Sequence, residues 1–322
     1  MEHRATTLLV QPQSTDPEFV KSIHQPSIPQ VPTIQSPPVA PEERPSLGRR
    51  LLSEGGLVFV VSLAIYFVIS GFLDFKYHSF IGDSFSRDAN GFYILYSRDP
   101  HLAAVGFVWE PLTSLCDMFF LLGNHLWPAL AHDNVAGSLT SAIAMAGVAY
   151  QLLAALREWG VSRNLRLVLV AFFILDPMIL FYSGNGMSEG LYMFTLMAAT
   201  RYLMRWIHTG EIRSIAYAGV ALGFSYLTRN EAAASIIAGA AAVALVSYWR
   251  ESGSHARRRI AALGDATIFA VPGVIAASGW AVVSFVITGS FFGQYSSMYG
   301  SSAQEALLSH EKFNVRDRKS VV

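Results

Sequence analysis

The chain carries few charged residues, and this scarcity limits the classes of protein to which it can belong. Of its 322 residues only 14% are charged and 52% are hydrophobic, and its mean hydropathy is +0.37. Soluble domains carry about a quarter charged residues, so this balance is typical of a membrane protein. The formal net charge is zero, so no general attraction to nucleic acid is expected.

Several motifs of catalytic and binding sites are also missing. The single cysteine, Cys116, excludes an internal disulfide and leaves no partner for a cysteine metal site. The sequence has no glycine-rich phosphate loop with lysine and no G-x-S-x-G elbow, which argues against nucleotide-driven pumping and serine hydrolysis. No metal ligand set is predicted. A divalent cation on carboxylates stays open, because their oxygens are hard ligands.

The two ends of the chain differ in composition from its middle. Residues 1–48 are rich in Pro, Gln, Ser and Thr and predict a disordered cytoplasmic tail. Residues 311–322 are expected to be non-native or disordered, because the stretch from Asp317 to Val322 matches one reading frame of a sequencing adapter. The natural protein is then expected to continue beyond about residue 316. Residues 49–310 are expected to form one transmembrane domain.

Seven apolar runs predict an all-α, polytopic protein of the plasma (inner) membrane. A bilayer core needs about 20 apolar residues, and Arg49 and Arg50 before the first run favour a cytoplasmic amino terminus. If each run crosses once, the arginine-rich connections 157–166, 201–213 and 250–259 all lie inside, as the positive-inside rule requires. The runs lie near 51–72, 135–156, 167–184, 187–206, 214–228, 232–249 and 266–289.

The first outer loop, 73–134, contains a stretch that could pass for an eighth span. Residues 102–123 are apolar, but a crossing here would move the three arginine-rich connections outside. The stretch also contains Glu110, Pro111 and Asp117, which are costly at bilayer depth. We therefore expect one or two helices at the outer interface.

The order of motifs resembles that of the GT-C glycosyltransferases, which use polyprenyl-phosphate sugars, such as aminoarabinose transferases and protein O-mannosyltransferases. The matching motifs are an acid after the first span (GDSFSRDAN), a proline-leucine loop (FVWEPLTSL), a YSGNGMSE turn and LTRNEA after the fifth span. The resemblance covers about 50–310. Two departures are the Ser after Asp83 and the presence of Glu110 where relatives often have another proline.

The resemblance implies transfer of a sugar from a polyprenyl-phosphate donor to a hydroxyl acceptor of unknown class, which can be a glycan, lipid or protein. Asp83 is the expected general base, with Asp88 as the other candidate. A helix cap that pairs with Arg87 is the structural alternative for Asp83. For Asp88 the alternatives are a solvated helix face or a partner for Arg87.

Further polar residues are expected to order the substrates. Glu189 either orients an acceptor or is a helix-start carboxylate favoured by the helix dipole. Arg229 either binds the donor phosphate or pairs with Glu231. Glu110 is expected to order the donor. Arg98 and His101 are headgroup candidates, for which a turn at Asp99-Pro100 is the simpler account.

Three further interpretations follow. The aromatics Trp109, Phe107 and Tyr96 fit an interfacial belt better than a sugar platform. Asp176-Pro177 predicts a kink rather than a proton relay. Two rival functions remain: a transporter or flippase, which would show paired broken helices in two halves, and a noncatalytic membrane scaffold.

Overall fold

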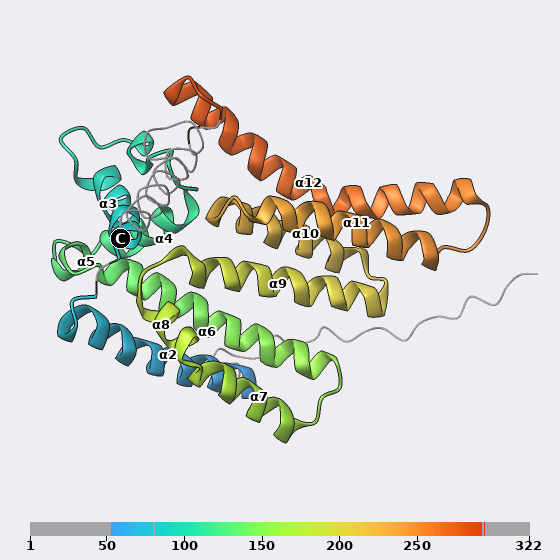
Figure 1. Cartoon of the computed structure of the whole chain (residues 1–322), viewed down its shortest axis with the longest axis horizontal. Helices are drawn as coiled ribbons and strands as arrows, with labels where there is room; N and C mark the ends of the chain where they lie inside the picture. Colours follow the sequence, from blue (N-terminus) through green and yellow to red (C-terminus); the bar gives the residue numbers. More distant parts are fainter. Residues whose placement is uncertain (1–52, 80, 292, 294–322) are drawn as a thin grey trace, which may run out of the picture. The chain divides into compact units, whose positions relative to one another are not determined.

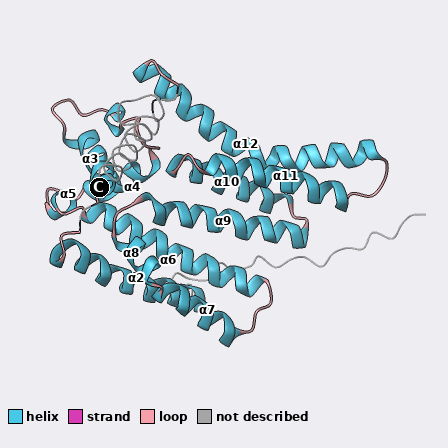
Figure 2. Cartoon of the chain, viewed as in Figure 1, coloured by secondary structure: helices cyan, strands magenta, loops and turns pink. Residues whose placement is uncertain are grey.

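The structure is a computed structural model that describes residues 53–79, 81–291 and 293. These residues are helical and contain no strand, which confirms the all-α prediction (Figure 2). The predicted tail at 1–48 and the predicted non-native end at 311–322 lie outside the described residues. The longer helices are α2 (Glu54–Gly71), α3 (Gly82–Tyr96), α4 (Leu112–Leu121), α6 (Val135–Glu158), α7 (Arg163–Leu175), α8 (Pro177–Gly184), α9 (Ser188–Thr209), α10 (Ile212–Thr228), α11 (Ala232–Arg250) and α12 (His255–Thr288).

Neighbouring helices pack in a chain of pairs that can be followed in Figure 1. Helix α6 lies between α2 and α9, α9 packs on α10, and α10 packs on α12, which also packs on α11. Helix α6 is the most buried of the long apolar helices, and Ala, Gly and Ser make up much of its buried surface. Small residues let helix backbones approach closely, so α6 is suited to the position between two neighbours.

Four helical stretches are long and apolar enough to cross a membrane by length and composition: Glu54–Lys76, Val135–Glu158, Ala232–Arg250 and His255–Thr288. The count is five if α7 and α8, which meet at a 60° bend, form one span. Helices α9 and α10 are not in this set, since α10 has only 17 residues and α9 carries Arg201 and Arg205. Apolar helices of this kind are compatible with a membrane location.

The bend between α7 and α8 arises from Asp176 and Pro177. The Asp176 carboxylate caps α8 by accepting hydrogen bonds from the main-chain N–H groups of Met178 (2.9 Å) and Ile179 (3.2 Å), and Pro177 occupies the first turn. Proline is well suited to that position because its missing N–H would have no helical partner there. The kink predicted at this dipeptide is confirmed.

Residues 73–134 form short helical pieces rather than one long helix. A π-helix, η2 (Phe72–Lys76), ends the first apolar stretch, and α3 follows. Within 102–123 the chain forms a 3₁₀ turn, η3 (Leu102–Val105), and then α4, separated by a loop. This stretch is therefore one 3₁₀ turn and one α-helix, which agrees with the one or two helices expected there, and its position at the outer interface stays a prediction. A further turn, α5 (Ala129–His132), leads into α6.

The two ends of the long helices carry different kinds of contact. At the end away from α3, Arg201 bonds to Gln151 (2.6 Å) and to Glu158, and Arg250 bonds to the carbonyls of Trp206 and Ile207. At the end that carries α3, polar side chains from α3 contact the α8–α9 turn and the start of α6. The candidate site lies at the second of these ends.

Candidate functional site at the α3 end

Arg87, on the second turn of α3, is the centre of the candidate site. Arg87 is only 4% exposed, and its guanidinium lies over the Trp109 ring, 4.6 Å from the ring centroid. Nη1 donates to the carbonyl of Asp83 (3.2 Å) and lies 3.9 Å from the Met187 sulfur. No carboxylate forms an ion pair with Arg87 within the described part of the chain. The guanidinium is therefore a buried cation with unused hydrogen-bond capacity.

The electrostatics around Arg87 keep it charged despite its burial. Burial lowers the pKa of the guanidinium, whereas the negative charges of Asp83, Glu189 and Asp117 raise it. A guanidinium stays protonated in proteins, so Arg87 is a cation throughout the physiological pH range. The cost of burying that charge falls if an anion binds beside it.

Arg229 follows α10 and joins two segments of the chain through carboxylates. Its Nη1 lies 2.5 Å from Glu189 Oε1 at the start of α9, and its Nη2 lies 2.7 Å from Glu231 Oε1 before α11. The hydrogen bonds that Arg229 donates to Glu231, together with the charges of both acids, hold the pKa of Arg229 above its usual range. The sequence alternative in which Arg229 pairs with Glu231 is confirmed.

Glu110 is the buried acid of this region, at 6% exposure. Burial raises the pKa of its carboxyl to about 7, and the charge of Glu231 adds to this effect while Arg87 and Arg229 oppose it. Its Oε1 is buried and has no hydrogen-bond partner among the residues described. We define the arginine cluster as Arg87, Trp109, Glu110, Glu189, Arg229 and Glu231.

Asp83 lies beside the arginine cluster, half-buried in the first turn of α3. The helix cap is Ile81, without a side-chain hydrogen bond, and Arg87 bonds to the Asp83 carbonyl rather than to its carboxylate. The alternative that treated Asp83 as a helix cap is therefore wrong. The resemblance-based role of Asp83 as base stays a prediction.

Arg98 and His101 do not reach the arginine cluster through any contact seen in the described residues. Both are exposed, in the segment after α3 ends at Tyr96. His101 Nδ1 lies 2.5 Å from the Asp99 carbonyl, which fits the turn expected at Asp99-Pro100. Their proposed role as headgroup ligands stays a prediction.

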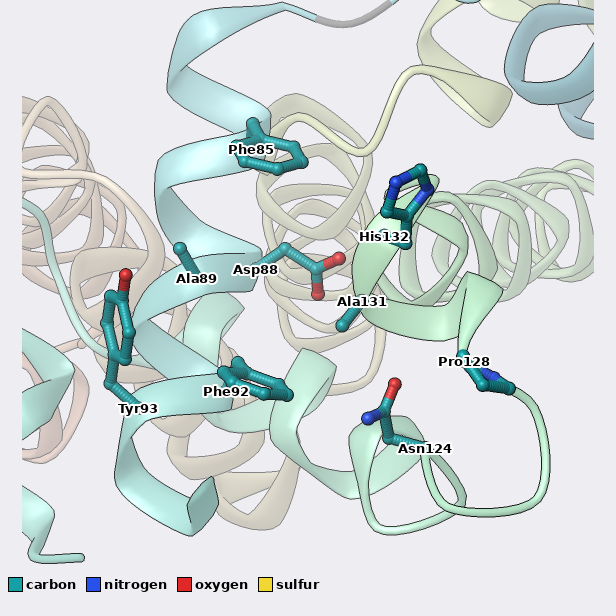
Figure 3. Close-up of a pocket in the computed structure, with 9 residues that line it drawn as sticks. All are labelled: Phe85, Asp88, Ala89, Phe92, Tyr93, Asn124, Pro128, Ala131 and His132. Carbon is teal, nitrogen blue, oxygen red and sulfur yellow. The ribbon is translucent and has the colours of Figure 1, made fainter. Parts of the chain in front are cut away.

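Asp88 makes no hydrogen bond or ion pair with the arginine cluster among the described residues. It is 1% exposed, and neither carboxylate oxygen has a hydrogen-bond partner within residues 53–79 and 81–291. Burial raises the pKa of Asp88, and the negative charges of Asp117 and Asp74 raise it further. The alternatives that placed Asp88 on a solvated helix face or against Arg87 are wrong. Its side chain lines a separate cavity, drawn in Figure 3.

Close packing of α3 on α4 brings Asp88 and Asp117 near each other. A Cβ at Gly91 of α3 would lie 2.8 Å from the Ser114 carbonyl of α4, so only glycine permits this approach. The approach brings Asp117 of α4 close enough to influence both Arg87 and Asp88. Burial raises the pKa of Asp117, while the Thr140 hydroxyl and Arg87 oppose the rise.

Hydrogen bonds join the α8–α9 turn to α6, and the start of α6 to α3. The Asn134 amide donates to the Ser84 hydroxyl at 2.8 Å, and the Ser138 hydroxyl donates to the Asp74 carboxylate and the Gly184 carbonyl, both at 3.0 Å. The Ser141 hydroxyl donates to the Met187 carbonyl at 3.2 Å. These bonds place Met187 and Glu189 beside Arg87.

Gly186 provides a direct test of this packing. Its φ is +68°, and an added Cβ would lie 2.3 Å from Ser84 Oγ and 2.5 Å from Asn134 Nδ2. Gly160 has a similar φ of +75° with nothing within 4 Å, so it is a matched control. We expect Gly186→Ala to destabilise the protein by about 1–3 kcal/mol more than Gly160→Ala, because overpacking adds to the shared backbone strain. Equal melting temperatures in detergent for the two variants would contradict the close approach.

An apolar groove adjoins the arginine cluster. It has a volume of about 450 Å³ between η3, α4 and α12, and its walls include Pro111, which follows Glu110, and Leu227, two residues before Arg229. Phe107 stacks on Trp280 in its wall, with 5.0 Å between ring centroids. Phe107 and Trp109 thus have packing partners inside the protein, and the belt interpretation does not describe these contacts.

Sequence reasoning missed three members of the arginine cluster as functional candidates. Arg87 was assigned to a local pair with Asp83, Trp109 to an interfacial belt, and Glu231 only to a pair with Arg229. The i, i+4 spacing that suggested the local pair gives no information on tertiary partners. The combination of one arginine in an amphipathic helix and a Trp-Glu-Pro loop nearby was the available signal.

Among the described residues, no three His, Cys, Asp or Glu side chains are placed to hold a metal ion together. The side chains of the arginine cluster fit phosphate and proton chemistry, since a cation with free donors lies beside a buried acid that can exchange its proton near neutral pH. Comparison with known proteins adds no assignment, since no family model, curated protein or solved structure matches this chain.

Proposed function

We propose that the protein is a membrane glycosyltransferase that moves a sugar from a polyprenyl-phosphate donor to an acceptor hydroxyl. The observation that carries this proposal is the meeting of Arg87 with the SGNGMSE turn, the WEP loop and the TRNEA loop in one cluster. Motifs that are far apart in the sequence contribute a free cation and a proton acceptor to the same site. Sugar transfer from a lipid phosphate needs both.

The phosphate of the donor leaves with the bonding electron pair and needs positive charge rather than a general acid. Arg87 suits this role, because its planar fork can meet two phosphate oxygens and no carboxylate of the described residues occupies it. Arg229 is already engaged by Glu189 and Glu231, so we assign it to positioning rather than to the phosphate.

The acceptor hydroxyl must lose its proton as its oxygen attacks the anomeric carbon. We assign this proton to Glu110, because a base works best when its pKa lies near the operating pH. The bond from the anomeric carbon to the phosphate oxygen breaks as the new bond forms, and the phosphate stays on its lipid. Asp83 is the second candidate for the base, and its half-buried position beside Arg87 keeps it within the site.

The apolar groove supports a lipid donor. Its lining is almost entirely apolar, and its walls include residues adjacent to Glu110 and Arg229. A lipid chain in the groove would leave its phosphate near Arg87, and burying apolar chain surface stabilises such a complex by roughly 25 cal/mol per Å².

We further propose that the chain crosses the plasma membrane seven times, with its amino terminus in the cytoplasm and the arginine cluster on the outer face. Helices α9 and α10 would be the two additional spans, since each packs along a neighbour that passes the length and apolarity requirement. The arginine-rich connections then lie together on the opposite, cytoplasmic side.

The function is tested by incubating membranes that contain the protein with radiolabelled polyprenyl-phosphate sugars. We expect label to pass to a water-soluble or lipid acceptor only when the protein is present. Release of the polyprenyl phosphate should match the label transferred. A protein that instead carries label across sealed vesicles without breaking the sugar–phosphate bond is a flippase, and a protein that does neither is a scaffold.

A further inference from the structure

A second cavity lies on another side of α3 and shares no residue with the arginine cluster. It has a volume of about 340 Å³ between α3 and the segment that runs from Asn124 to His132. Figure 3 shows Asp88 pointing from α3 across this space toward α5, with Phe85 and Phe92 on either side of it. The cavity is large enough for a small molecule or a lipid headgroup.

Unpaired acceptors mark this cavity as a binding site. Both carboxylate oxygens of Asp88 are buried without a hydrogen-bond partner in the described part of the chain, and so is the side-chain oxygen of Asn124. Leaving a buried polar atom unpaired costs about 1–3 kcal/mol, and more for a charged group. Three such oxygens beside one cavity are unusual, because native proteins pair nearly all their buried polar groups.

The chemistry of the lining limits the ligand. Among the residues that the structure describes, no lysine or arginine lines the cavity, and the ring of His132, which is largely exposed, is bonded to Asp133 at 3.0 Å. An anionic ligand would find no cation and would meet the carboxyl of Asp88. A ligand that fits must therefore donate hydrogen bonds to the unpaired oxygens.

The surroundings of the cavity also favour positive charge. Asp74 and Asp117, which do not line the cavity, place negative charge near Asp88. Aromatic residues Phe85, Phe92 and Tyr93 line the space, and aromatic faces attract cations within about 6 Å of the ring centre. A protonated primary amine has three donors, which equals the number of unpaired oxygens.

We propose that this cavity binds the primary ammonium group of a small molecule or of a lipid headgroup, with Asp88 and Asn124 as its acceptors. The inference does not depend on sugar transfer, since it rests on residues outside the arginine cluster. Binding would place a cation beside Asp88 and supply the hydrogen bonds that its carboxylate lacks. The ligand would lie on the same helix as Arg87 but on a different side of it.

The test uses the purified full chain in detergent micelles with two probes of matched size, ethanolamine and ethylene glycol. Saturation-transfer NMR titrations should show ethanolamine binding at least about tenfold more tightly, as expected for hydrogen bonds to a charged group. Equal binding of the two probes would overturn the proposal. Repeating the titration in phosphatidylethanolamine and phosphatidylglycerol nanodiscs tells whether the ammonium group belongs to a lipid headgroup or to a small molecule. A lipid headgroup that binds in the cavity competes with ethanolamine only in the phosphatidylethanolamine nanodiscs.

Variants identify the cavity as the binding site. Asp88→Asn keeps the side-chain size and should weaken ethanolamine binding at least about tenfold, and Asn124→Leu should weaken it by a smaller factor. Asp99→Asn is the matched control, because Asp99 is an exposed acid on the segment that follows α3. Ethanolamine affinity unchanged in both Asp88→Asn and Asn124→Leu, or reduced equally by Asp99→Asn, would overturn the proposal.

Discussion

Glu110→Gln is expected to lower the turnover of sugar transfer by about 100-fold or more, the range that a positioned general base contributes. The substitution keeps the size of the side chain and removes its ability to take the acceptor proton. The substrate is expected to bind nearly as well, since Glu110 acts when the bond forms. The measurement is kcat and KM for transfer of labelled sugar in detergent or nanodiscs.

The pH dependence follows from the raised pKa of Glu110. A base works only when it is ionised, so activity should rise with pH through about 7, where burial places the pKa of this carboxyl. Glu110→Gln should abolish that rise along with most of the rate. Asp83→Asn separates the two candidates: if it causes the larger loss and Glu110→Gln retains the pH profile, the base is Asp83 and our assignment is wrong. Asp99→Asn is the exposed control and should retain full activity.

Arg87→Gln is expected to lower kcat/KM for the donor by about 100-fold, because it removes the cation that meets the leaving phosphate. Arg87→Lys should recover part of this loss, since lysine restores the charge without the two-pronged geometry. The lysine variant also loses guanidinium stacking on Trp109, so full recovery is not expected.

The control for Arg87→Gln is Arg213→Gln. Arg213 is an exposed arginine at the start of α10, at the opposite end of the helices. Its transfer rate should match the wild type. Circular dichroism and melting temperature establish that each variant is folded. Wild-type kcat/KM in a folded Arg87→Gln protein would show that the donor phosphate binds elsewhere, with Arg229 as the next candidate.

The positions of the long helices could be predicted from the sequence because apolar runs of this length are a strong local signal. The run near 135–156 became α6 at Val135–Glu158, and the run near 232–249 became α11 at Ala232–Arg250. The cost of Glu110, Pro111 and Asp117 at bilayer depth predicted that 102–123 is not a span but one or two helices at the outer interface. The count of seven spans stays a proposal, because α9 and α10 do not meet the requirements of length and apolar composition for a membrane span.

The site was predicted less completely, because its contacts are tertiary. Glu189 and Arg229 were both named as candidates, and their ion pair joins residues 40 positions apart in the sequence. Arg87 was missed because a local pair with Asp83 was the simplest account of its spacing, whereas its guanidinium contacts Trp109 and Met187. The cavity beside Asp88 was also missed, since a charged residue next to an arginine on an amphipathic helix is usually solvated.

The account depends on the arginine cluster facing the outside of the cell, where a lipid-linked sugar can reach it, while the arginine-rich connections face the cytoplasm. The direct measurement introduces single cysteines by Ser86→Cys on α3 and Arg213→Cys on α10 in a Cys116→Ser background, since both positions are exposed. A membrane-impermeant maleimide applied to intact cells should label position 86 and should label position 213 only after the membrane is permeabilised. Labelling of position 213 in intact cells, or protection of position 86 until permeabilisation, would contradict the account.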